Sequence, residues 1–351
     1  MEVTTEFITS NVSSLCSEVS APWCGDNEPW VNVIIDIFLW FLCIFTVFGN
    51  MLVLTVFVRD RELRSNVSNL FIVNLALADL LVGCVSIPIN NLYRSACWWY
   101  FSAAACRFWI TMDFSECTVS VWAIVLISYD RYILVTKGLE YERYQTLRKF
   151  LILSTLVWTI SYTRYICSYV VYDWIVGSSI NYDCECYSDV LTQSGFVIYD
   201  IITSNAIPVC LIAYFNARLY MRIRELSRRQ RNRRANAAVT TTSAVTTTST
   251  SVTGTTTGGV SNTFPSVNRP HLRRHRKAAV TLAILVGVAC VCWIPYFTIT
   301  FLQVTFGISF STRALIVSYY IFYANSAVNP LLYVATNPRI RSGIVKIFRF
   351  N

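Results

Sequence analysis

Charged residues are scarce in this chain of 351 residues. Asp, Glu, Lys and Arg make up 14% of it, against about 25% in soluble domains, while hydrophobic residues make up 54%. This composition excludes an ordinary soluble domain and is typical of a chain that crosses a membrane several times. The chain also lacks a paired nucleophile and base and any metal-ligand spacing, so the sequence does not indicate an enzyme.

Basic residues are absent from residues 1–30, whereas residues 222–234 contain seven arginines. Because Lys and Arg are retained on the cytoplasmic side of a membrane, we expect the N-terminus to lie outside the cell. The net charge of +9 is concentrated where anionic inner-leaflet lipid and cytosolic partners are found, so it indicates topology and no nucleic-acid partner. Asn11 begins an Asn-Val-Ser sequon on the outer side and is a predicted glycosylation site.

Internal repeats and a cleavable signal peptide are lacking too. The first apolar run begins near Val31 and is too long for the core of a signal peptide, so we expect the first span to direct insertion. Seven segments are long and apolar enough to cross roughly 30 Å of hydrocarbon. They cover residues 31–58, 67–92, 103–135, 147–174, 190–221, 278–304 and 314–334. The predicted fold class is an all-α membrane protein, a bundle of seven transmembrane helices whose two termini face opposite sides.

The domain organisation follows from these spans. Residues 1–30 form an outer tail, residues 31–334 the seven-helix domain, and residues 335–351 a short amphipathic helix and tail. The cytosolic third loop covers residues 222–277, and we expect its Thr-rich part, residues 239–263, to be disordered. Asn337 followed by Pro338 predicts the start of the last helix, whose apolar and basic faces suit the inner leaflet of the lipid bilayer.

The third span carries two acids, Asp113 and Glu116, within an otherwise apolar helix. At about 100° per residue, Glu116, Cys117 and Ser120 fall within about 60° of Asp113, and Arg131 returns to the same direction. Asp113 and Arg131 then lie about 27 Å apart, near opposite ends of the membrane. A buried carboxylate costs several kcal/mol unless a cation meets it, so Asp113 predicts an outer site for a cation.

Three motifs and four single residues, distributed over all seven spans, resemble the signature of rhodopsin-like G-protein-coupled receptors. The motifs are Asp130-Arg131-Tyr132, Cys292-Trp293-Ile294-Pro295 and Asn329-Pro330-Leu331-Leu332-Tyr333. The single residues are Asn50, Asp79, Trp158 and Pro208. The resemblance covers the chain apart from the N-terminal tail and the Thr-rich segment.

The resemblance implies where the chain would meet its partners. Arg131 would contact a heterotrimeric G protein at the plasma membrane, and arrestin is a further implied partner. Pro295 removes a backbone hydrogen bond beside Trp293 and leaves a hinge that a ligand can bias. A sodium ion is implied at polar residues of the hydrocarbon zone, with mutual hydrogen bonding and buried water as the alternative; no other cofactor is indicated. These polar residues are Asp79, Ser120, Asn325, Ser326 and Asn329.

Asp113 determines the ligand class that the resemblance implies. It follows Cys106 by seven residues, which matches the carboxylate that pairs with the ligand ammonium in receptors for biogenic amines. Tyr323 looks like the hydroxyl that holds this carboxylate, and it stands where an opsin has its retinal-linking lysine. The other expected ligand-site residues on these helices, several of them aromatic faces for cation–π contact, are Cys117, Trp293, Tyr296, Phe297 and Tyr319. Neutralisation of Asp113 by an internal arginine is the alternative.

Within the amine group, the chain is similar to two branches of the histamine receptors. The stretches ISYDRYILVT and IPVCLIAYFNARLY resemble the inhibitory-coupling branch, and CWIPYFT and YANSAVNPLLY the stimulatory-coupling branch, so the G-protein class stays open. Asp200 occupies the place of the acid that engages imidazole in the second branch, and Ser204 the place of the corresponding acid in the first. We therefore expect histamine, or another ligand with an ammonium at one end and a donor or second cation at the other. The alternatives are acetylcholine, another monoamine and a non-amine ligand. Acetylcholine fits less well because Phe297 stands where an amide is expected.

Glu116 and Arg164 depart from the family pattern. Because the third and fourth helices are neighbours in this fold, we predict that the two side chains form an ion pair inside the membrane. One alternative is that Arg164 extends outward to the membrane interface. The other is that Arg164 reaches the pocket and admits an acidic ligand.

The outer cysteines and one histidine complete what the resemblance implies. Cys186 precedes Pro208 by 22 residues, which fits the second outer loop of the family and implies a disulfide with Cys106. Pairing of Cys184 with Cys97 and of Cys16 with Cys24 is one arrangement of the others, and the sequence leaves it open. His275 stands where many amine receptors have a Glu that locks Arg131, so we predict appreciable ligand-independent signalling.

Two rival functions belong to other classes. A transporter or channel would carry its ionisable groups near the midplane on discontinuous helices, whereas here Asp113 and Arg131 lie near opposite ends of one helix. A receptor-like scaffold without signalling is disfavoured by the intact Asp130-Arg131-Tyr132 motif. The sequence therefore favours an amine-activated, G-protein-coupled receptor.

Overall fold

The computed structural model describes residues 29–177, 180, 182, 184–246 and 269–349, and the regular elements within them are helices. They are α2 (Pro29–Arg59), α3 (Arg61–Ser65), α4 (Val67–Leu81), η2 (Val82–Ser86), α5 (Ile87–Ala96), α6 (Ala103–Lys137), η3 (Gly138–Glu140), α7 (Tyr141–Tyr144), α8 (Leu147–Tyr165), η4 (Ile166–Val171), α9 (Tyr172–Val176), η5 (Asp189–Thr192), α10 (Ser194–Ile201), η6 (Ile202–Ala206), α11 (Ile207–Thr246), α12 (Arg269–Phe306), α13 (Thr312–Thr336) and α14 (Pro338–Arg349).

The predicted seven-helix bundle is confirmed. Within the described residues, six helical stretches are long and apolar enough to cross a membrane, and they match the first six predicted spans. The seventh span corresponds to α13, which has 25 residues and packs against α2 and α12. It is less apolar than the others because it buries several polar side chains, among them Asn325, Ser326 and Asn329.

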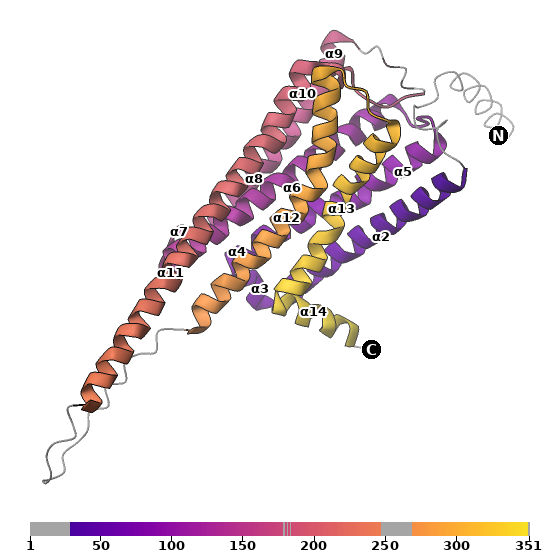
Figure 1. The fold of residues 1–351 in the computed structure, drawn as a ribbon. Helices are drawn as coiled ribbons and strands as arrows, with labels where there is room; N and C mark the ends of the chain where they lie inside the picture. Colours follow the sequence, from indigo (N-terminus) through magenta and orange to yellow (C-terminus); the bar gives the residue numbers. More distant parts are fainter. Residues whose placement is uncertain (1–28, 178–179, 181, 183, 247–268, 350–351) are drawn as a thin grey trace, which may run out of the picture.

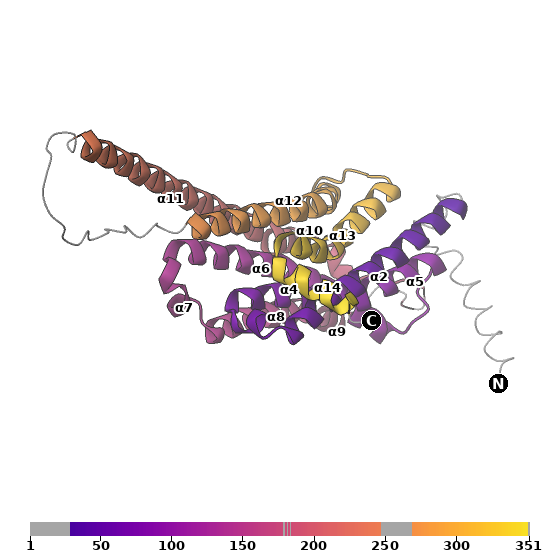
Figure 2. The same ribbon diagram turned by 90° about the horizontal axis from the view of Figure 1, so that it is seen from below.

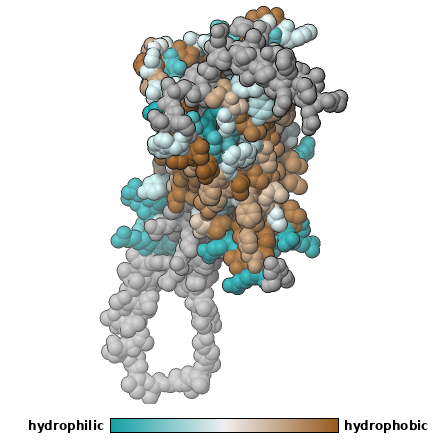
Figure 3. Space-filling view, turned by 90° about the vertical axis from the view of Figure 1, so that its right-hand side faces the viewer, coloured by the Kyte–Doolittle hydropathy of each residue, from teal (hydrophilic) through white to brown (hydrophobic). Residues whose placement is uncertain are grey.

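α6 is the central helix of the bundle. It contacts α4, α8, α11 and α12, and 78% of its most apolar window is buried, more than in any other span of the described chain. Figure 1 shows the long helices running side by side, with α11 projecting well beyond the bundle. Figure 3 shows a belt of apolar side chains around the middle, with hydrophilic ones toward both ends. The acids Asp113 and Glu116 of α6 are thus surrounded by other helices of the bundle.

One end of the bundle carries α5 and α9 and is called the disulfide end below, and the opposite end carries α14 (Figure 1). The predicted start of α14 is confirmed: Asn337 Oδ1 accepts hydrogen bonds from the backbone nitrogens of Arg339 (3.1 Å) and Ile340 (3.4 Å). Ile340 is buried against the bundle. Figure 2 shows α14 lying across this end of the molecule, where it contacts α2 and α13.

Gly343 allows α14 to pack closely against α2. A Cβ atom at this position would lie 2.4 Å from Val56 Cγ1 and 3.1 Å from Val56 Cγ2. Contacts that short are not tolerated between carbon atoms, so a side chain at residue 343 would force the two helices apart.

Three spans contain a π-helical segment: η2, η4 and η6. All three lie in the half of the bundle toward the disulfide end (Figure 1). η2 and η6 accompany Pro88 and Pro208, whose rings clash with the preceding turn and whose nitrogens donate no hydrogen bond, whereas no proline accompanies η4. Each wide turn changes the direction in which later side chains point relative to an uninterrupted α-helix.

The prediction of disorder is wrong for residues 239–246. α11 continues to Thr246, because the Arg- and Ala-rich sequence before the Thr-rich segment favours helix and carries it onward. Residues 247–263 of that segment lie outside the described residues, and so do the sequon at Asn11 and the cysteines Cys16 and Cys24.

Candidate functional site

A pocket, called the cavity below, lies among α6, α8, α10, η6, α12 and α13, toward the disulfide end. Its lining is mostly apolar and aromatic with a few polar groups, which is typical of a site for a small molecule. Its lining contains seven of the nine predicted ligand-site residues, and the two others, Trp293 and Tyr323, lie behind it. The lining residues are Asp113, Phe114, Cys117, Thr118, Val121, Tyr165, Asp200, Ser204, Tyr296, Phe297, Tyr319 and Phe322.

Asp113 is 3% exposed and is held by two hydroxyl groups of α13. Tyr319 donates to Oδ2 (2.5 Å) and Tyr323 donates to Oδ1 (2.8 Å). Among the described residues no Lys or Arg pairs with this carboxylate, so the alternative of an internal arginine is not observed. Each oxygen keeps a lone pair that a donor can reach, since a carboxylate has about four acceptor sites and the tyrosines use two.

Aromatic rings of α12 and α13 form the wall beside Asp113. The ring of Tyr296 lies 5.3 Å from that of Tyr319 and 5.2 Å from that of Phe297, between ring centres. Phe297 packs edge-on against Phe322 at 5.6 Å. Trp293, one turn deeper in α12, is 3% exposed and belongs to the core beneath the cavity. Such a wall presents π faces to a cation that binds at Asp113.

Asp200 lines the cavity from α10 and forms an ion pair with Arg164. Arg164 Nη2 lies 2.8 Å from Asp200 Oδ1, and the two side chains are 11% and 12% exposed. The same guanidinium donates to Ser204 Oγ (2.5 Å) and, through Nη1, to Thr203 Oγ1 (2.5 Å). The positive charge of Arg164 is therefore paired with Asp200 inside the wall formed by α8, α10 and η6.

The predicted ion pair between Glu116 and Arg164 is wrong. Glu116 is fully buried, accepts a hydrogen bond from Tyr162 (3.0 Å) through Oε1, and has no partner for Oε2 within the described residues. Arg164 lies two residues after Tyr162 on α8, about 200° further around the helix, and so points toward α10 instead of α6. The alternative that Arg164 extends outward is not observed either, because its head group is buried.

Tyr165 is the main site residue that the sequence analysis missed. It is 1% exposed, its hydroxyl donates to Asp200 Oδ1 (2.7 Å), and it lies 3.0 Å from Thr118 Oγ1. A tyrosine directly after an intramembrane arginine was the available signal. Phe114, Thr118 and Val121 were also missed, although they follow the face of Asp113 and Cys117 at intervals of one residue or one turn.

The predicted sodium-site residues meet around Asp79, which is fully buried. Asn329 Nδ2 donates to Oδ2 (2.7 Å) and Ser120 Oγ donates to Oδ1 (3.2 Å). Asn325 and Ser326 are buried on the same helix as Asn329, and Asn325 Oδ1 has no hydrogen-bond partner within the described residues. A carboxylate with an unpartnered amide oxygen is a donor set that suits a hard cation, so these residues fit sodium.

The Asp130-Arg131-Tyr132 motif lies in the half of α6 toward the α14 end. Asp130 is fully buried and accepts hydrogen bonds from Ser68 (2.5 Å) and Tyr141 (2.7 Å). No ion pair of Arg131 occurs in the described part of the chain, while Tyr132 packs near Phe215. The remaining motif residues lie inside helices, Pro295 in α12 and Asn329, Pro330 and the buried Tyr333 in α13.

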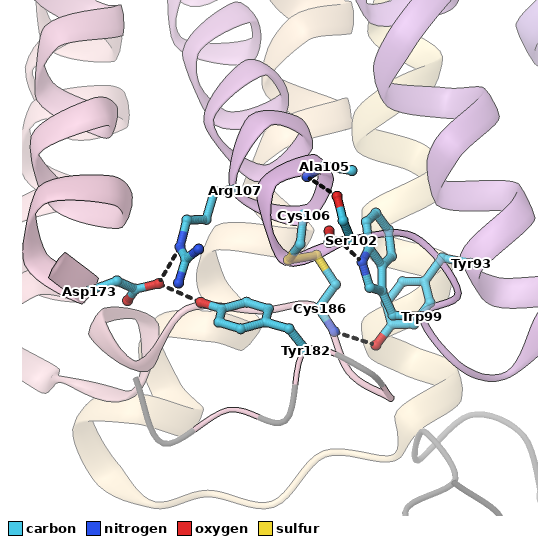
Figure 4. Close-up of a disulfide and its surroundings, with 9 residues drawn as sticks. All are labelled: Tyr93, Trp99, Ser102, Ala105, Cys106, Arg107, Asp173, Tyr182 and Cys186. Carbon is cyan, nitrogen blue, oxygen red and sulfur yellow. Dashed lines mark hydrogen bonds and ion pairs between the residues drawn. A yellow bond between two sulfur atoms is a disulfide. The ribbon is translucent and has the colours of Figure 1, made fainter. Parts of the chain in front are cut away.

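The disulfide end is covered by the segment that follows α9. A disulfide joins Cys106 at the start of α6 to Cys186, and the backbone nitrogen of Cys186 donates to Tyr93 Oη (3.1 Å; Figure 4). Arg107 pairs with Asp173 of α9 (3.1 Å), which also accepts a hydrogen bond from Tyr182. Cys97 and Cys184 are disulfide-bonded as well. This segment is thus fixed to α6 and α9.

Comparison with known proteins agrees with this arrangement. Residues 49–333 match the family model of the 7 transmembrane receptor (rhodopsin family). The alpha-1A adrenergic receptor of Oryzias latipes is 28% identical over 345 residues, or 97% of this chain and 71% of that receptor. The histamine H2 receptor of Cavia porcellus (29% over 319 residues; 90% and 80%) and the histamine H4 receptor of Homo sapiens (29% over 353 residues; 86% and 88%) match to a similar degree.

Proposed function

The chain belongs to the rhodopsin family of seven-transmembrane receptors, and we propose that a small cationic amine activates it by binding at Asp113. Its relatives place it with receptors of the biogenic amine type. Such receptors are multi-pass membrane proteins and not enzymes. Coupling to a heterotrimeric G protein is part of the proposal.

Asp113 is the observation that carries the ligand class. Its carboxylate lies in the wall of a small buried cavity, and two neutral hydroxyls are its only hydrogen-bond donors among the described residues. An ammonium group would supply the charge that burial of this acid requires, and the rings of Tyr296 and Tyr319 would contact its other side.

We favour a histamine-like ligand among the amines. Asp113 of α6 and Asp200 of α10 line the same cavity, so a short molecule with an ammonium at one end and a polar group at the other reaches both. The similar identities to adrenergic and histamine receptors support an amine and leave its skeleton to experiment.

Signalling would pass along α12. The ligand touches Tyr296 and Phe297, which flank Pro295, a residue that leaves a backbone carbonyl of α12 without its usual partner. A small change of the bend at Pro295 and Trp293 becomes a larger displacement at the far end of the helix, near Arg131, where a G protein and arrestin would dock. The basic residues indicate that the N-terminus lies outside the cell. The disulfide end would then face the outside, from which the ligand comes, and the α14 end would face the cytosol.

Sodium would serve as an allosteric ligand. The cation would be held by Asp79 with Ser120, Asn325, Ser326 and Asn329, which come from α4, α6 and α13. It would supply the positive charge that keeps Asp79 ionised while it is buried, and so hold these three helices together.

The test is a G-protein activation assay in transfected cells, with a panel that includes histamine, tyramine and acetylcholine, run on the wild type and on Asp113→Ala. We expect at least one amine to activate the wild type and the response to fall by more than about 100-fold in the variant, because a buried charge pair is lost. Surface expression is measured for each.

Glu116→Gln is the matched control, since it removes an acid one turn along the same helix that does not line the cavity. It should respond like the wild type. Silence toward every amine with normal surface expression, or an amine response that Asp113→Ala retains, would reject the proposal.

A further inference from the structure

Arg164 lies just behind the cavity wall, and its guanidinium is committed to one acid of that wall. It is not itself a lining residue, yet Asp200, Ser204 and Tyr165, which line the cavity, all bond to it. Its ring contacts are short too, with Cζ 4.2 Å from the centre of the Tyr165 ring. The arginine is therefore held in place from several sides.

The ion pair changes the charge of the pocket. Asp113 and Asp200 would together give two negative charges, but Arg164 cancels the charge of Asp200 at 2.8 Å. Glu116, the other acid nearby on α6, does not line the cavity. The lining with its adjoining arginine then carries a single uncompensated negative charge, at Asp113, and a ligand with one positive charge neutralises it.

A second ammonium would meet an unfavourable environment near Asp200. It would have to approach a carboxylate whose charge is already paired, next to a guanidinium of the same sign. The hydrogen bonds to the Asp200 carboxylate within the described residues all end on Oδ1. Oδ2 remains an acceptor for a neutral N–H or O–H group.

We infer that Arg164 is a specificity-determining residue, which makes the receptor select singly charged amines bearing a neutral hydrogen-bond donor and reject diamines. The inference rests on the proposed function and deepens it, because the sequence left open whether the far end of the ligand is a donor or a second cation. A ligand with a neutral imidazole or hydroxyl at that end fits.

The experiment compares two ligands of one skeleton: tyramine, whose ring carries a neutral hydroxyl, and para-aminomethyl phenethylamine, whose ring carries a second ammonium at neutral pH. G-protein activation and competition with a bound amine are measured for both. We expect tyramine to be at least about tenfold more potent on the wild type, because like charges repel in the pocket. In Arg164→Met, which leaves Asp200 unpaired, we expect the diamine to become the more potent ligand.

Two further variants control the result. The double variant Arg164→Met, Asp200→Asn removes both charges and should restore the preference for tyramine. Because it leaves no unpaired buried charge, it can be tested even if Arg164→Met fails to reach the cell surface. Arg107→Met breaks a different arginine–aspartate pair, outside the cavity, and should leave the ranking unchanged.

The outcomes separate the two proposals. Provided that the responses disappear in Asp113→Ala, three results would overturn the inference. The wild type or the double variant could prefer the diamine, or Arg164→Met could reach the cell surface with the ranking of the two ligands unchanged. If no amine activates the wild type, or if binding ignores Asp113, the amine proposal fails and this inference with it. If another amine activates the wild type through Asp113 but neither of these two ligands binds, the inference is overturned and the amine proposal stands.

Discussion

Of the buried acids in the described residues, Asp79, Asp113, Glu116 and Asp200 lie at or near the two predicted cation sites, and each is compensated in a different way. Asp200 has an arginine, Asp113 has two tyrosine hydroxyls, and Asp79 has a serine and an asparagine. Glu116 has one tyrosine, and one of its oxygens has no partner within the described chain. A neutral donor offsets only part of the cost of burying a charge, so Asp113, which lines the cavity, and Asp79, which lies among further polar side chains, would both gain from an external cation.

We predict that sodium weakens the amine response through Asp79. The cation would hold α4, α6 and α13 in the present arrangement, whereas the amine would act by changing the packing of α12 against α13, so by linkage each ligand lowers the affinity of the other. Replacing NaCl by choline chloride should raise amine potency about threefold to tenfold in the wild type and leave Asp79→Asn unchanged.

Asp36→Asn provides the comparison for Asp79→Asn, since Asp36 is a partly buried acid of α2 that pairs with Arg94 away from this cluster. It should keep the sodium effect. A wild-type response that is insensitive to sodium would argue for hydrogen bonding without an ion at Asp79.

At the scale of helices, apolar run length predicted the spans well because crossing a membrane requires about 20 apolar residues. The cap at Asn337 was predictable for a similar reason, since its side chain satisfies local backbone donors. The partner of Arg164 was not predictable. Two acids, Glu116 and Asp200, lie on helices next to α8, and only the direction of the arginine around α8 decides between them.

Asp113 and Cys117 of α6 could be predicted from spacing, whereas Phe114, Thr118 and Val121 of the same helix were missed although they also line the cavity. Projecting residues at about 100° each assumes an uninterrupted α-helix, and η6 breaks that assumption around Ser204. Family resemblance supplied Asp200 and Ser204. It did not supply the contacts of Arg164 and Tyr165 with Asp200, which depend on how α8 packs against α10.

Close packing of α14 on α2 leads to a stability prediction. Gly343→Ala should lower the thermal unfolding midpoint of the detergent-solubilised receptor by a few degrees, because the added methyl overlaps Val56 and overpacking costs about 1–3 kcal/mol. Ser342→Ala, at the exposed neighbouring position, is the control and should have little effect.

Combining Gly343→Ala with Val56→Ala tests the assigned contact, since the second change makes room for the first methyl. The double variant should be more stable than the sum of the two single effects. Strict additivity would mean that the added methyl does not act through its contact with Val56.

At the scale of the whole molecule, the proposed signalling requires an equilibrium between inactive and active arrangements of the helices. Asp130 is held by Ser68 and Tyr141, while Arg131 has no ion pair among the described residues. His275 belongs to α12, and its side chain lies outside the described residues. The sequence still predicts that a residue which is neutral near pH 7 locks Arg131 less well than a glutamate.

We therefore predict basal G-protein signalling above that of mock-transfected cells, and a decrease of about fivefold in His275→Glu, the change expected from roughly 1 kcal/mol of added ion pairing. His271→Glu adds the same charge one turn away and serves as the control. Basal signalling equal to that of mock cells would contradict the prediction, and so would an equal effect of the two substitutions.

The ion pair between Arg164 and Asp200 also constrains how this receptor can evolve. A mutation that removes only one partner strands the other charge inside the membrane, which costs several kcal/mol and reduces the amount of folded receptor. A descendant gene can therefore lose the pair at little cost only through substitutions in both codons, or by passing through a form that retains Asp200 and gains a diamine as its new ligand. Duplicated copies, in which one gene is free of selection, are where such a change of ligand would be found.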